Sequence, residues 1–234
     1  PIMKKYVSLL ALIVSLNCFG QVQLYRVNLV RAAPGKLLEL IDLYKADIKN
    51  AEQLGIAKPY LMRHSQGDQW DLMLIYPTAE NSSDVEGAKT LARPYGDAFY
   101  KLVSFQEEAV VAGPTTAKFN EWFEQYPYYH VEIFTALSGK QTELLKQREM
   151  ENIYLKEINR RPNFIFTRVF GSSCDIFTIG FYNGVKDYAA AADISDVDKE
   201  RAAKRAGFQG AAYIGTYLRA LILEHHDTLA GKVR

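Results

Sequence analysis

The feature that most constrains the fold of this 234-residue chain is an internal repeat. Several residues recur at a constant offset of 104 positions (129 − 25 = 104): Tyr25-Arg26-Val27 and Tyr129-His130-Val131, Gly35-Lys36 and Gly139-Lys140, Gly67 and Gly171, Asp71 and Asp175. A constant offset, kept over many positions and accompanied by a matching hydrophobic pattern, indicates two copies of one structural unit.

Each copy has the same predicted order of elements. Side chains that alternate between apolar and polar predict first strands at Gln23–Ala32 and Tyr128–Ala136. Pro34-Gly35 and Ser138-Gly139 end these strands, and helices with apolar residues at helical spacing follow. Gly55 and Asn159 stand near the expected helix ends, where such residues often form caps.

A hairpin follows the helix in each copy. Residues 60–66 and 69–76 flank Gly67-Asp68, and residues 163–170 and 173–182 flank Gly171-Ser172. Two-residue loops of the Gly-X type match the twist of paired strands. They also set the register, so paired residue numbers add up to 135 in the first copy and to 343 in the second.

A second helical region is predicted at residues 83–111 and at residues 186–228. A β-α-β-β-α-β unit would also need a fourth strand. The sequence offers residues 109–112 and 232–234 as candidates for it.

Residues 1–20 have the pattern of a secretory signal peptide. Lys4 and Lys5 precede an apolar stretch at 6–16, and the small residues Cys18 and Gly20 lie before a cut at Gln21. The apolar stretch is too short for a transmembrane helix. We expect a periplasmic or secreted protein, with lipidation of Cys18 as the alternative.

The remaining chain divides into a first repeat at 21–113, an aromatic linker at 114–127 and a second repeat at 128–234. Without the leader, Cys174 is the single cysteine, so an internal disulfide is excluded. The chain has 28 basic and 27 acidic residues, a balance that favours neither nucleic acid nor an anionic membrane as partner. Motifs of nucleotide-binding loops, serine hydrolases, zinc proteases and thiol oxidoreductases are absent from the sequence.

This arrangement resembles the dimeric α/β-barrel superfamily, in which two ferredoxin-like units pack their sheets into one barrel. The members include antibiotic-biosynthesis-type monooxygenases, EthD-like and NIPSNAP-like proteins, and chlorite-dismutase-like haem proteins. The resemblance implies an α+β fold in which two tandem ferredoxin-like repeats form the barrel within one chain. The haem-binding members use a proximal His, for which this sequence offers no matching position, and the cofactor stays unknown.

The first strand of each copy predicts where a site lies. Tyr25, Val27 and Leu29 share one face with apolar equivalents in the second copy, and we expect this face to meet the helices. The opposite face is then expected to line the barrel interior, with these residues: Arg26, Asn28, Val30, His130, Glu132 and Phe134. Polar residues on a shielded face are the informative observation.

A catalytic hypothesis follows from that placement. His130 is expected to donate or accept a proton, Glu132 to orient it, and Arg26 to hold an anionic or enolate oxygen. Asn28 is expected to contact the ligand. The alternative is a satisfied polar layer between two sheets, without a ligand.

The hairpin register places His64 opposite Asp71 (64 + 71 = 135) and Arg168 opposite Asp175 (168 + 175 = 343). Each pair is expected to lie beside apolar residues of the same face, including Tyr60 in the first copy and Phe164 and Phe166 in the second. A few charged groups in an aromatic lining are typical of ligand pockets. The alternative is a pair of half-exposed ion pairs.

Two further clusters stand out. His225-His226-Asp227 is expected near a helix end, where adjacent residues point about 100° apart and cannot all bind one metal ion. The favoured interpretation is that these residues cap the helix end or are solvated. A role as ligands of a small molecule or a metal ion is the alternative, and no metal site is assigned. The aromatic linker is expected to pack across the barrel seam, or else to form a lid or a partner surface.

The leading functional hypothesis is an exported protein that binds a small, partly apolar ligand in the barrel. A cofactor-independent oxygenase or isomerase is the second hypothesis, and an interaction module with a filled barrel is the third. A filled interior would favour the interaction module, and an open cavity would favour binding or catalysis.

Overall fold

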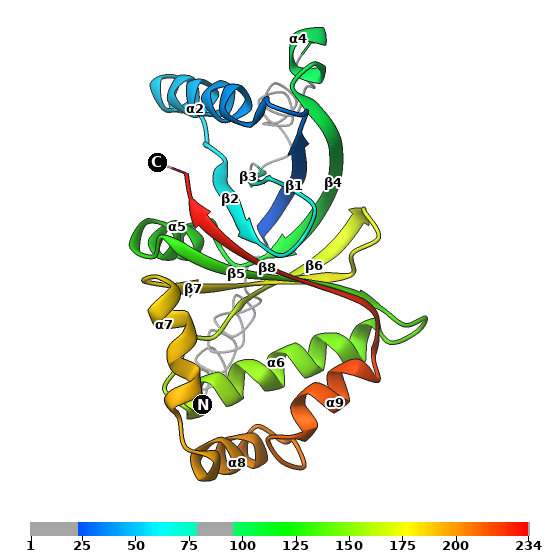
Figure 1. Cartoon of the computed structure of the whole chain (residues 1–234). Helices are drawn as coiled ribbons and strands as arrows, with labels where there is room; N and C mark the ends of the chain where they lie inside the picture. The colour runs from blue at the N-terminus through cyan, green and yellow to red at the C-terminus, as the bar shows by residue number, and fades with distance from the viewer. Residues whose placement is uncertain (1–22, 79–95, 234) are drawn as a thin grey trace, which may run out of the picture.

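The computed structural model describes residues 23–78 and 96–233 and is shown in Figure 1. Eight antiparallel strands close into a barrel in the order β1-β3-β2-β8-β5-β7-β6-β4. Their bounds are β1 Gln23–Ala32, β2 Tyr60–Gln66, β3 Leu72–Pro77, β4 Val103–Gly113, β5 Tyr128–Ala136, β6 Phe164–Gly171, β7 Ile176–Tyr182 and β8 Ile222–Lys232. Among the described helices, none combines the length and apolar character needed to cross a membrane.

The barrel consists of two sheets, one from each repeat. The first repeat contributes the order β4-β1-β3-β2 and the second contributes β8-β5-β7-β6. They join where β2 pairs with β8 and where β4 pairs with β6. The α+β barrel of two tandem ferredoxin-like units is therefore confirmed.

Helices cover the outside of each sheet (Figure 1). The first repeat carries α2 (Leu37–Gln53) and the short α4 (Asp97–Tyr100). The second carries α6 (Gln141–Glu157), α7 (Val185–Ala189), the 3-10 helix η3 (Ala190–Asp193), α8 (Asp196–Arg205) and α9 (Tyr213–Arg219). Apolar residues of α2, such as Leu40 and Tyr44, pack on the outward face of the first sheet. Leu144 of α6 does the same on the second sheet.

The predicted hairpin registers are confirmed. Tyr60 lies opposite Ile75 (60 + 75 = 135) and Phe164 lies opposite Ile179 (164 + 179 = 343). Gly67 has a φ of 117°, in the left-handed region that favours glycine, and its turn packs against the backbone of β8. Asn159 also has a positive φ, as expected of a residue just beyond a helix end.

The interior of the barrel is largely filled by aromatic and aliphatic side chains from both sheets. The linker forms a helix, α5 (Thr116–Gln125), capped by the side chain of Thr115. Its Phe119 and Phe123 are buried in this interior cluster, and Tyr60 donates a hydrogen bond of 2.6 Å to Asn120. The linker therefore packs against the barrel interior.

The predicted phase of the first strands is wrong. Tyr25, Val27, Tyr129 and Val131 line the barrel interior, and the polar face that carries Arg26, Asn28, His130 and Glu132 points to the helical layers. The physical reason is that the lumen is lined by side chains from all eight strands and is largely filled by apolar and aromatic residues, which leave no partners for charges there. Charged residues on the outward faces form ion pairs with neighbouring strands and helices.

The predicted second helical regions are also corrected. Residues 103–113 form β4 and residues 222–232 form β8, although both segments were assigned to helices except at their ends. Each strand pairs with a first strand over most of its length, and this long-range pairing outweighs local helix preference. The part of the first predicted helix at 83–95 lies outside the described residues.

Candidate functional site

A cavity remains open in the barrel, at the end opposite α5. It has a volume of about 280 Å³ and an apolar wall from both repeats, including Leu29, Met73, Ile133 and Phe177. Leu29 and Ile133 are equivalent positions of the two repeats (133 − 29 = 104), so the cavity lies on the axis that relates them. We call it the lumen cavity.

The rim of the lumen cavity is polar and mostly acidic. Asp68, Glu107, Glu224 and His226 all border it. His226 Nδ1 lies 3.3 Å from Asp68 Oδ1, and Glu107 accepts a hydrogen bond from the Ser172 hydroxyl. The rim therefore offers carboxylate acceptors to a ligand that enters the cavity.

Residues predicted to bind a ligand lie mostly elsewhere. Tyr60, Phe164 and Phe166 do face the interior, but they belong to its filled part around α5. Their inward orientation was predicted correctly from the sequence, but aromatic neighbours fill the space that a ligand would need.

The two predicted hairpin ion pairs differ from each other. Arg168 Nη2 lies 2.6 Å from Asp175 Oδ1, which confirms the second pair. His64 and Asp71 pair through their backbones, and the buried His64 Nε2 has no partner among the residues that the structure describes. The Asp71 carboxylate accepts a hydrogen bond from the Ala32 amide instead, because a register shift in β1 frees that N–H.

The proposed catalytic trio is not assembled. Arg26 lies on the outward face of the first sheet and forms a 2.8 Å ion pair with Glu108. His130 and Glu132 lie on the outward face of the second sheet, and β1 and β5 are separated by three strands in the barrel. Asn28 is buried beside Arg26, and its Oδ1 finds no partner in the described part of the chain.

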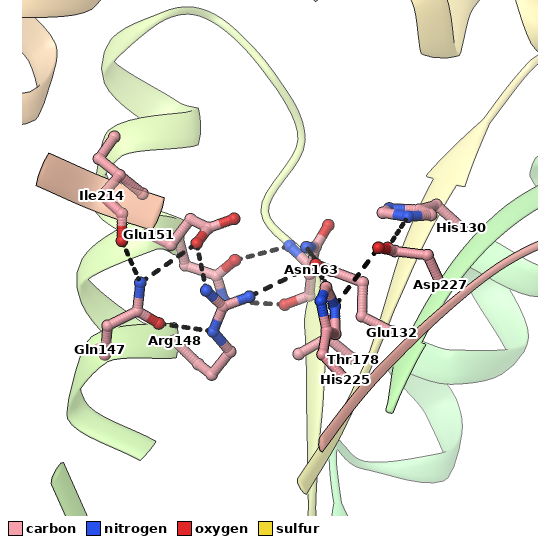
Figure 2. A network of polar contacts seen from close by, with 11 residues as sticks. His130, Glu132, Gln147, Arg148, Glu151, Asn163, Thr178, Ile214, His225 and Asp227 are labelled. Atoms are coloured by element: carbon pink, nitrogen blue, oxygen red, sulfur yellow. Dashed lines mark hydrogen bonds and ion pairs between the residues drawn. The ribbon is translucent and has the colours of Figure 1, made fainter. Parts of the chain in front are cut away.

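His130 and Glu132 nevertheless belong to a polar cluster with two residues of β8 (Figure 2). His130 Nε2 lies 2.8 Å from Asp227 Oδ1. His225 Nε2 lies 3.6 Å from Glu132 Oε1 and 3.6 Å from Asp227 Oδ2. Because β8 is a strand, His225 and Asp227 share a face, and His226 points to the lumen. We call His130, Glu132, His225 and Asp227 the outer cluster.

Helix α6 closes the outer cluster from the other side, as Figure 2 shows. Arg148 Nη1 lies 3.6 Å from Glu132 Oε1, and its Nη2 pairs with Glu151. Thr178 of β7 donates a 2.9 Å hydrogen bond to Glu132 Oε2. Glu132 is thus a buried carboxylate held in one orientation by residues of three elements.

The charges around the outer cluster change the affinity of its groups for protons. Burial alone would raise the pKa of Glu132, but His225, Arg148 and His130 outweigh it and lower the pKa to about 2. Burial would lower the pKa of His130, and the neighbouring carboxylates of Asp227 and Glu132 instead raise it. Glu132 is therefore an anion at neutral pH.

Comparison with known proteins gives the fold. No protein-family model and no curated protein matches the sequence. Among solved structures, an anthrone oxidase-like protein superposes with a TM-score of 0.61 at 12% identity, covering 92% of this chain and 93% of its own. A presumed monooxygenase of Fusobacterium nucleatum has a TM-score of 0.55 at 10% identity, with coverages of 92% and 94%.

A chlorite dismutase of Candidatus Nitrospira defluvii superposes with a TM-score of 0.50 at 11% identity, covering 92% of both chains. These neighbours belong to the dimeric α/β-barrel superfamily, and this chain shares their fold. The identities are so low that these matches establish the fold of the chain and leave its specific family open.

Three groups of the outer cluster have metal-ligating character. One ligand atom each from His130, Glu132 and Asp227 lies within 4.8 Å of the other two. This grouping could not be predicted from the sequence once residues 222–228 were assigned to a helix, because only a strand places His225 and Asp227 on one face. The contributions of Arg148 and Thr178 had no sequence signal, since α6 and β7 meet the cluster only through the tertiary fold.

Proposed function

We propose that this chain is an exported protein that binds a small, largely apolar molecule in the lumen cavity. The observation that carries the proposal is an open volume of about 280 Å³ in a barrel whose remaining interior is packed. Protein interiors seldom contain voids much larger than a water molecule, so a space of this size needs an explanation.

The size and lining of the cavity indicate the ligand class. Typical ligand sites measure roughly 300–1,000 Å³, and an apolar cavity of about 150 Å³ accommodates benzene. A molecule of about two fused rings fits this range. The acidic rim of Asp68, Glu107 and Glu224 favours a ligand with hydroxyl or amino donors over an anionic ligand.

Calorimetric titration tests this proposal with two probes of the same shape, 2-naphthol and 2-naphthoate. We expect 2-naphthol to bind and 2-naphthoate to bind at least about tenfold more weakly, equal to ~1.4 kcal/mol. Ala109 lines the cavity, so Ala109→Phe should fill it and abolish binding. Val110→Phe, on the opposite face of β4, is the matched control.

Equal binding to both variants would contradict the proposed location. Failure of the chain to bind any apolar probe would favour the interaction module, for which the packed part of the lumen already provides support. Native mass spectrometry of protein purified from its own cells would reveal a molecule that copurifies with it.

Export is a separate part of the proposal, supported by the pattern of residues 1–20. Protein recovered from the exported fraction should begin at Gln21 when its amino terminus is sequenced. A mature protein that begins at Cys18 and partitions with membranes would support lipidation instead. Retention of the full leader in the cytoplasm would refute both.

An oxygenase-like enzyme is the second candidate function. It is supported by the fold likeness to an anthrone oxidase-like protein and a presumed monooxygenase. Oxidation of anthrone by O₂ to anthraquinone and water is a balanced test reaction, followed with an oxygen electrode and by the absorbance of the quinone. Oxygen uptake no faster than without protein would remove this substrate from consideration.

A further inference from the structure

The outer cluster has properties that the proposed function leaves unexplained. We propose that His130, Glu132, His225 and Asp227 bind a divalent transition-metal ion between β5, β8 and α6. Figure 2 shows the four side chains converging from two adjacent strands.

The distances between the ligand atoms suit one ion. His130 Nε2 and Asp227 Oδ1 lie 2.8 Å apart, and His225 Nε2 lies 3.6 Å from one oxygen each of Glu132 and Asp227. Bonds of about 2.0–2.2 Å from a tetrahedral ion place its ligand atoms about 3.3–3.6 Å from one another. One ligand atom each of His130, Glu132 and Asp227 lies within 4.8 Å of the other two, so these three residues form the core of the site. Rotation of the His225 side chain adds the fourth ligand.

The ligand types define the class of metal. Two imidazoles with two carboxylates suit zinc and divalent iron, cobalt or nickel, whereas calcium and magnesium prefer oxygen ligands alone. We therefore expect a transition metal.

Carboxylates outnumber guanidinium groups in this region. Glu132, Asp227 and Glu151 lie around a single guanidinium, that of Arg148, so the site attracts a cation. Protonation of both histidines is the alternative that the experiment must separate from binding of a metal ion.

The first repeat supplies an internal comparison. Arg26 and Asn28 occupy the positions of His130 and Glu132 (130 − 26 = 104; 132 − 28 = 104). Glu108 lies opposite Asn28 on β4, as Asp227 lies opposite Glu132 on β8. The guanidinium of Arg26, 2.8 Å from Glu108, provides there the fixed positive charge that the second repeat lacks at this position.

The same registers make Gln106 the equivalent of His225, because they lie opposite Val30 and Phe134. The first repeat therefore has Arg, Asn, Gln and Glu where the second has His, Glu, His and Asp. Only the second set consists entirely of common metal ligands.

The outer cluster can be reached from solvent, and Glu132 already has a fixed orientation. The Asp227 side chain is 56% exposed, so an ion can reach the cluster from solvent. Glu132 is oriented by Thr178 and Arg148, and such outer partners fix a ligand for its metal.

The test uses the full chain without a histidine tag. Calorimetry with Zn²⁺ should show one ion per chain, and Co²⁺ should develop a visible absorption band typical of nitrogen and oxygen ligands. His225→Ala and Asp227→Asn remove partly exposed side chains, and each should weaken Zn²⁺ binding at least about tenfold. Gln106→Ala and Glu108→Gln, at the equivalent positions of the first repeat, should leave Zn²⁺ binding unchanged.

A thermal melt gives a second readout. Zn²⁺ should raise the melting temperature of the wild-type chain and leave that of the His225→Ala/Asp227→Asn double variant unchanged, since a ligand stabilises only the state that binds it. Wild-type protein that binds Zn²⁺ no better than the double variant would overturn the proposal and leave the cluster as a network of protonated histidines and carboxylates. If only the first-repeat variants lost Zn²⁺ binding, the proposed location of the metal site in the outer cluster would be wrong.

Discussion

The carboxylate of Asp175 accepts a hydrogen bond of 2.8 Å from the backbone amide of Ala136. Asp71 makes the same contact with Ala32, 104 residues earlier in the chain, also at 2.8 Å. Both amides lie at a register shift, where the first strand of the repeat loses its regular pairing with the last. The repeated aspartates therefore satisfy the N–H group that each shift leaves unpaired.

Asp175→Ala should lower the free energy of unfolding by about 2–3 kcal/mol, because it leaves a buried amide unsatisfied and removes the partner of Arg168. Urea denaturation measures the loss. Glu149→Ala, at an exposed position of α6, serves as the control and should change stability by less than about 0.5 kcal/mol. A similar small change for Asp175→Ala would contradict the role assigned to this aspartate.

Phe119 should be the main anchor of α5. It is fully buried and makes ring contacts with residues of both sheets, among them Tyr25 and Phe166. Phe119→Ala should cost about 3–5 kcal/mol in unfolding free energy, because it leaves a large cavity in the lumen. Phe170→Ala removes the same ring from a site that is 62% exposed and should cost less than about 1 kcal/mol. Comparable losses in the two variants would show that α5 does not seal the barrel.

Gly67 and Gly35 offer a matched pair of substitutions to alanine. Both have positive φ, but a Cβ at Gly67 would lie 2.0 Å from the Asp227 carbonyl oxygen, whereas at Gly35 it would meet no atom within 4 Å. Gly35→Ala should cost about 1–2 kcal/mol from backbone strain. Gly67→Ala should cost about 1–3 kcal/mol more, because the hairpin must move away from β8. Thermal melts show which of the two variants loses more stability. A larger loss for Gly35→Ala would contradict the contact between the Gly67 turn and β8.

Cys174 should behave as an unreactive thiol in the folded protein. Burial raises its pKa from an ordinary 9.0 to about 12. At pH 8 the folded chain therefore has about a thousandfold less thiolate than the unfolded chain, and reaction with a disulfide reagent should slow accordingly. The Cys18→Ser variant isolates this thiol, and denatured protein is the reference. Rapid native labelling at pH 8 would disprove the shielding.

The raised pKa of Cys174 also makes the free energy of unfolding depend on pH. A thiol whose folded pKa is raised favours the folded state below the unfolded pKa, and this contribution falls as the pH rises from about 9 toward 12. Cys174→Ala should remove the part of this loss that begins near pH 9, below the pH range in which buried tyrosines such as Tyr25 and Tyr182 contribute. Urea titrations between pH 8 and pH 10 would detect the difference.

The local structure was predicted correctly where it depends on periodic patterns among residues close together in the chain. The bounds of β1 and β5 match the predicted strands, and the hairpin registers follow from two glycine turns. The prediction was wrong for β4 and β8, which were assigned to helices. Each is the last strand of a repeat and is stabilised by pairing with a first strand far away in the chain. Local propensity carries little information about such pairing.

The amino-acid sequence by itself determined the duplication, the alternation of side chains and the positions of the turns, because each depends on residues close together in the chain. The tertiary structure decided which face of each strand points inward. Alternation divides a strand into two faces, and only the closing of two sheets into one barrel makes the lumen the better place for Tyr25 and Tyr129. That same closure brings His130 of β5 beside Asp227 of β8, a contact across 97 residues of chain.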